Sequence, residues 1–137
     1  MFWLALAALL CATAFDLASR EIPDTISIVL ILAAIAAKFA GLHPLGWSQI
    51  GLGAGGAFVV TTALFAAGGL GGGDVKLLTA LGAVLGAGAM LPFAILTGLF
   101  GGIAAWIARR RGETEIAYAP VMLVGLLGLL PIHWFGQ

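Results

Sequence analysis

Two aspartates at the ends of apolar segments are the residues whose type and position suggest chemistry. Asp16 ends the first apolar segment of the chain, and Asp74 begins the fourth, directly after three glycines. An ionisable group that borders hydrocarbon is costly, and such a group is by default a functional hypothesis with a partner to be named. We expect each aspartate to be the partner of the other.

A close pair of carboxylates is suited to general acid–base catalysis. Two such groups cannot both ionise easily, so the pair can hold one proton. The charged member can take a proton from water, while the protonated member donates to the carbonyl oxygen under attack. This arrangement needs no metal and no cofactor, and because the pair titrates as a unit, the sequence does not assign the acid and the base. The alternative for Asp74 is a purely structural one, in which it is the N-cap of a helix after a glycine turn.

The composition indicates what must position these aspartates. The chain has 137 residues, of which 62% are hydrophobic and 9% are charged, with a formal net charge of zero and one cysteine. Soluble domains carry about 25% charged residues, so this is an integral membrane protein in contact with the lipid bilayer. The absence of a basic patch excludes a nucleic-acid binder. One cysteine allows no intrachain disulfide.

Charged residues and helix breakers divide the chain into six apolar segments. A helical span needs roughly 20 apolar residues, and backbone polar groups in lipid must be satisfied within the segment. The sequence therefore predicts an all-α, polytopic bundle of six transmembrane helices in a single domain over residues 1–137, with a retained first helix rather than a signal peptide. The predicted spans are Met1–Phe15, Asp24–Leu42, Ser48–Ala67, Val75–Leu91, Pro92–Ala108 and Tyr118–Phe135.

The charges predict the orientation of this bundle. Six helices place the segments 16–23, 68–74 and 109–117 on one side, and those segments and their edges hold five of the six basic residues and all six acidic ones. Basic residues favour the cytoplasm, so this side faces the cytoplasm, and both termini face away from it. The polar chemistry thus lies at the cytoplasmic face.

Glycines four residues apart predict close contacts between helices. The pairs are Gly51/Gly55, Gly82/Gly86 and Gly98/Gly102, and small residues at that spacing let helices approach closely in lipid. Residues 51–56 also match G-x-G-x-x-G, but they lie inside an apolar helix without the strand that a dinucleotide site requires.

Two segments resemble the signatures of the type IV prepilin peptidases. Residues 16–24, DLASREIPD, are similar to the first signature, an aspartate, a short basic stretch, then Ile-Pro and Asn or Asp. Residues 71–77, GGGDVKL, resemble the second, G-x-G-D-x-K-L, and Tyr118-Ala119-Pro120 is similar to the start of the family's last helix.

This resemblance implies an aspartyl protease of the GxGD type, whose catalytic aspartates match Asp16 and Asp74. Its substrates are prepilins or pseudopilins, from which it removes a short basic leader just before the hydrophobic segment, at the bacterial or archaeal inner membrane. The cysteine-rich region that carries methyl transfer in larger members is missing. We therefore expect the short, peptidase-only type associated with tight-adherence (Flp) pili, without a methyltransferase domain. No oligomeric state follows from the sequence.

Several further residues are candidates for supporting roles. Gly71, Gly72 and Gly73 leave room for an extended peptide beside Asp74. Arg20 and Lys76 lie near the aspartates in sequence and either tune the pair or anchor lipid headgroups.

Three acidic residues have open alternatives. Asp24, which follows Pro23, is expected to be a helix N-cap, with substrate contact as the alternative. Glu113 and Glu115 either meet a basic leader or are simply solvated.

Two other functions fit a membrane protein with two such aspartates. Intramembrane carboxylates also serve as proton or cation sites in transporters, although no carboxylate here completes a path to the opposite face. A non-catalytic subunit of a pilus or secretion system would tolerate the loss of both carboxylates.

Overall fold

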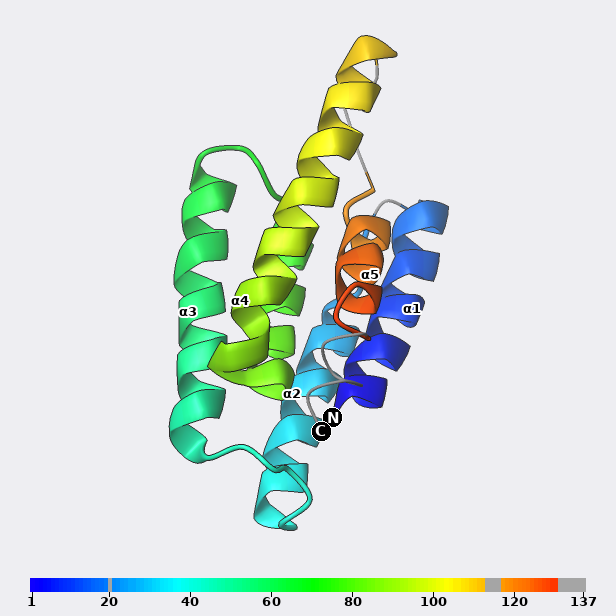
Figure 1. Ribbon diagram of the computed structural model, residues 1–137. Coiled ribbons are helices and arrows are strands. Elements are labelled where there is room, and N and C mark those ends of the chain that lie inside the picture. The colour runs from blue at the N-terminus through cyan, green and yellow to red at the C-terminus, as the bar shows by residue number, and fades with distance from the viewer. Residues whose placement is uncertain (20, 113–116, 131–137) are drawn as a thin grey trace.

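The computed structural model describes residues 1–19, 21–112 and 117–130. In these residues the only regular secondary structure is helix, and loops connect the helices (Figure 1). The helices are α1 (Phe2–Ser19), α2 (Asp24–Phe39), α3 (Trp47–Ala66), α4 (Gly72–Arg110) and α5 (Ala119–Leu127). The all-α prediction is confirmed. Three helices, α1, α3 and α4, are long and apolar enough to cross a membrane. The prediction of six spans is therefore supported only for these three, because α2 has 16 residues and α5 has nine, and residues 131–135 of the last predicted span lie outside the described residues.

Helix α4 is broken at Gly86 into two arms, residues 72–85 and 87–110. Gly86 has φ 71° and ψ 170°, a conformation that is open to glycine and strained for other residues. Figure 1 shows the chain reversing there, so that the second arm returns toward the end of the bundle where the first began. The predicted boundary between Leu91 and Pro92 was wrong, since Pro92 lies inside the second arm. Gly86, and not the proline, carries the reversal.

The first arm of α4 is the central helix of the bundle. From Leu77 to Gly86 all residues except Thr79 are buried, as expected for a helix that is apolar on every side. Helix α3 packs along α4, and α1 packs against α5 and α2. Large apolar side chains on α3 and on the second arm, such as Leu52, Val59 and Ile95, are exposed. These outer faces suit contact with lipid.

One end of the bundle holds the C-terminal ends of α1 and α3 (Figure 1). Both ends of α4 lie there too, because the helix reverses at Gly86. We call this end of the bundle the site end, because it carries Asp16 at the end of α1 and Asp74 at the start of α4. His43 is buried at the opposite end, where its Nδ1 accepts a hydrogen bond from the Leu45 N–H. The fold thus separates Asp16 and Asp74 from this histidine.

Glycines bring α3 and α4 into backbone contact, but only part of the predicted set does so. A Cβ on Gly53 would overlap the Gly82 carbonyl oxygen, and one on Gly82 would overlap Gly53. Gly86 also lies in this contact, whereas a Cβ on Gly51, Gly55, Gly98 or Gly102 would meet nothing within 4 Å. The four-residue spacing correctly predicted that small residues on α3 make a close helix contact. It did not predict that Gly53, rather than Gly51 and Gly55, makes that contact.

Replacing Gly82 by valine is expected to destabilise the bundle by at least about 1–3 kcal/mol, because the side chain must push α3 away. The measurement is thermal unfolding of the purified protein in detergent. Gly51→Val is the control, since it makes the same change on a helix where the new side chain meets open space. Equal unfolding temperatures for the two variants would contradict the contact.

Candidate functional site

Asp16 is a buried carboxylate held by the start of another helix. Its side chain lies in the last turn of α1 and is 7% exposed. Its Oδ2 accepts a hydrogen bond from the backbone N–H of Ala119, at 2.9 Å. Ala119 begins α5, and the first N–H groups of a helix have no partner within the helix. Asp16 therefore accepts a hydrogen bond from one of these free N–H groups of α5. It also lies at the positive end of the α5 helix dipole.

Asp74 stands at the start of α4 in a comparable setting. It is the third residue of the helix, it is partly buried, and its Oδ2 accepts a hydrogen bond from the Gly71 N–H at 3.1 Å. The N-cap residue of α4 is Gly71. The alternative prediction, that Asp74 is the N-cap, was therefore wrong, because Asp74 lies three residues later. Its carboxylate instead reaches back from the third position, as the acidic residue of a capping box does.

Both aspartates line one pocket at the site end, with a volume of about 310 Å³. The residues that line it come from the end of α1, the segment before α2 and the start of α4. They are Asp16, Glu21, Ile22, Asp24, Gly71, Gly72, Gly73 and Asp74. The two segments that carry the aspartates, 58 residues apart in sequence, are thus brought together. Among the described residues that line it, four carry carboxylates and none is basic.

The three glycines line this pocket, and Gly73 packs against the segment before α2. A Cβ on Gly73 would lie 3.3 Å from the Ile22 Cβ and 3.5 Å from the Ile22 carbonyl oxygen. Around Gly72 there is more room, since the nearest atom to such a Cβ is in the Phe65 ring at 3.9 Å. Of the three glycines, only Gly73 therefore lies against Ile22.

Asp24 and Lys76 form an ion pair at the edge of the pocket. Lys76 Nζ lies 2.5 Å from Asp24 Oδ2, and both side chains are more than half exposed. The expectation that Asp24 is an N-cap was wrong, because Pro23 takes the N-cap conformation of α2 and Asp24 becomes its first residue. Lys76 thus bridges the start of α4 to the start of α2.

The ion pair is exposed, so Lys76→Met is expected to lower the free energy of unfolding by no more than about 1 kcal/mol. Chemical unfolding in detergent measures this, with Asp24→Asn as the partner variant. The double variant should be no less stable than either single one. A loss several times larger would show that the pair holds the two helices together.

The sequence did not single out three residues that help to build the site. Glu21 and Ile22 line the pocket, and the Ala119 N–H binds Asp16. Ala119 had a readable signal, because Pro120 directly after it marks the first turn of a helix, where free N–H groups point outward. Arg20, Glu113 and Glu115, which were also candidates, lie outside the described residues.

Within the described ranges, no group of three His, Cys, Asp or Glu side chains is placed to hold a metal ion.

Comparison with known proteins gives one family. A family model described as the type IV leader peptidase family matches residues 3–106, which include both Asp16 and Asp74. Searches of curated proteins and of solved structures gave no match.

Proposed function

The chain belongs to the type IV leader peptidase family, and from this premise we propose that it is a membrane aspartyl endopeptidase that cleaves Flp-type prepilins or pseudopilins. In this proposal Asp16 and Asp74 are the catalytic residues. The observation that carries it is their common pocket at the end of the bundle where the acidic residues gather.

The proposed reaction is hydrolysis of one peptide bond by an activated water. The ionised aspartate takes a proton from the water, whose oxygen attacks the carbonyl carbon, and the protonated aspartate donates to the carbonyl oxygen. The C–N bond of the resulting tetrahedral intermediate then breaks, and the leaving amine takes a proton from the pair. The hydrogen bonds from Ala119 to Asp16 and from Gly71 to Asp74 hold the two side chains in place for this reaction.

The charge of the pocket supports a basic leader as the substrate segment. Asp16, Glu21, Asp24 and Asp74 all line it, and a basic peptide would be drawn to this cluster. Gly71, Gly72 and Gly73 leave the backbone of α4 open to an extended peptide. We place this end at the cytoplasmic face of the inner membrane, which is where the leader of a prepilin lies.

The test is reconstitution of the purified protein in liposomes together with a full-length Flp-type prepilin. We expect removal of the leader, with a single new N-terminus identified by mass spectrometry. The control is the Asp16→Asn, Asp74→Asn double variant in the same liposomes. No cleavage of any prepilin by the unmodified chain would overturn the proposal. Proton flux that depends on Asp16 would instead favour a transporter.

A further inference from the structure

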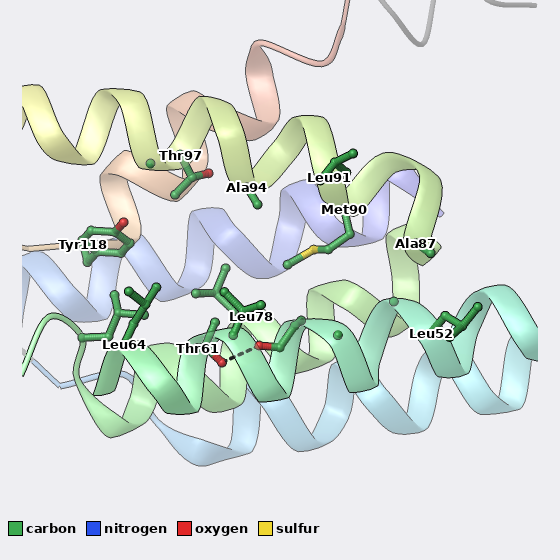
Figure 2. A pocket seen from close by; sticks show the side chains of 16 residues that line it. Leu52, Thr61, Leu64, Leu78, Ala87, Met90, Leu91, Ala94, Thr97 and Tyr118 are labelled. Atoms are coloured by element: carbon green, nitrogen blue, oxygen red, sulfur yellow. Dashed lines mark hydrogen bonds between the residues drawn. The ribbon is translucent and has the colours of Figure 1, made fainter. Parts of the chain in front are cut away.

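A second cavity, of about 340 Å³, lies between α3 and the two arms of α4 (Figure 2). Buried side chains such as Ala57, Leu78 and Met90 form its floor. Its rim carries the exposed side chains of Leu52, Val60, Leu64 and Leu91. None of the 16 described residues that line it is charged. We call this cavity the apolar groove.

The apolar groove begins where the aspartate pocket ends. Leu70 lines the groove and Gly71, the next residue, lines the pocket. Tyr118 lines the groove, and the N–H of the next residue, Ala119, binds Asp16. Figure 2 shows Tyr118 and Leu64 at one end of the groove and Leu52 and Ala87 at the other. The groove and the pocket are thus lined by neighbouring residues at two places in the chain, 70–71 and 118–119.

The dimensions of the groove indicate what it accepts. From Leu52 to Leu64 helix α3 rises by about 18 Å, more than half of a hydrocarbon core of about 30 Å. A helix of that length and about 10 Å diameter occupies about 1,400 Å³, so the groove takes one face of such a helix rather than all of it. That face would present apolar side chains at helical spacing.

Two glycines leave room for such a helix to approach closely. Gly56 on α3 and Gly98 on the second arm both line the groove, and a Cβ on either would meet nothing within 4 Å. Positions without side chains allow the close approach of helices in lipid.

We propose that the apolar groove binds the hydrophobic helix of the substrate, while the aspartate pocket holds the peptide bond just before that helix. This inference rests on the proposed function. It follows from continuity, since the bond to be cut lies next to the hydrophobic segment, and the groove starts next to the pocket. A lipid chain or a second copy of this protein could cover the same apolar surface, but neither carries a peptide bond that must reach the aspartate pocket.

The first test fills the groove without touching the aspartates. Gly56→Leu is expected to lower kcat/KM for a full-length Flp-type prepilin in liposomes about tenfold. Cleavage of a soluble peptide that contains the leader and the cleavage site, without the hydrophobic segment, should stay within twofold. Gly55→Leu is the matched control, because Gly55 is the neighbouring exposed glycine and does not line the groove. Equal cleavage of the full-length prepilin by both variants would overturn the inference.

The second test does not depend on catalysis. A photo-reactive p-benzoylphenylalanine is placed at Val60 or at Val59 in the Asp74→Asn variant. Both side chains are exposed, at 58% and 67%, but only Val60 lines the groove. We expect a covalent adduct with the hydrophobic segment of the prepilin from position 60, and little or none from position 59.

The outcomes separate the two proposals. If the unmodified chain cleaves the prepilin but position 60 reacts only with lipid or with a second copy, the groove inference fails and the proposed function stands. If the unmodified chain cleaves no prepilin, the proposed function fails, and the groove inference fails with it. An adduct with the prepilin from position 60, together with the selective effect of Gly56→Leu, supports both.

Discussion

Asp16→Asn and Asp74→Asn are each expected to lower kcat for prepilin cleavage by about 10³–10⁴-fold. Asparagine cannot accept a proton from water or donate one as an acid, so either change removes half of the acid–base pair. Its side-chain oxygen can still accept the hydrogen bond that the aspartate accepts now, from Ala119 or from Gly71. The fold should therefore survive, and single-turnover cleavage in liposomes measures the loss.

The matched control is a third carboxylate in the same pocket. Asp24 also lines it, but its side chain is more than half exposed and is paired with Lys76. Asp24→Asn should change kcat by only a few-fold. The double variant of Asp16 and Asp74 should be about as slow as either single variant, because the two act as a unit. A retained tenth of the activity in Asp74→Asn would contradict the assignment of that residue.

The meeting of Asp16 with Asp74 was predictable because the charge pattern places both at one end of an alternating bundle. In the predicted alternation each apolar segment crosses from one end to the other, which places the end of the first helix and the start of the fourth on the same side. The partners of the two side chains were harder to predict. Ala119 is 103 residues from Asp16, and Lys76 is 52 residues from Asp24. No local pattern encodes such distant contacts.

The position of the turn within α4 could not be predicted from the sequence for a different reason. Proline is the stronger helix breaker by propensity, which favoured a boundary at Pro92. The turn instead lies at Gly86, since a chain reversal needs a backbone conformation that proline cannot adopt and glycine can. The chain has many glycines, and no local sequence feature shows which of them adopts this conformation.

Gly73→Val is expected to lower kcat/KM for prepilin cleavage about 100-fold. The Cβ alone would lie 3.3 Å from the Ile22 Cβ, so the branched side chain must push the start of α4 away from the segment before α2. Asp74 follows Gly73 directly and would move with it. A displacement of about 1 Å in a catalytic group is enough to cost two orders of magnitude in rate. The measurement is cleavage in liposomes, with the unfolding temperature recorded for each variant.

Two further variants separate crowding of Ile22 from other effects of a valine in this turn. Gly72→Val places the same side chain one residue earlier, where the nearest atom to the new Cβ is 3.9 Å away, so kcat should fall at least tenfold less than in Gly73→Val. The comparison uses kcat and not KM, because Gly72 also lines the pocket proposed to hold the substrate. Adding Ile22→Gly to Gly73→Val removes the Ile22 Cβ, the atom nearest to the new side chain, and should restore part of the activity, because contacting residues are energetically coupled. Unchanged cleavage by Gly73→Val, or no recovery at all in the double variant, would show that the approach of α4 to Ile22 does not position Asp74.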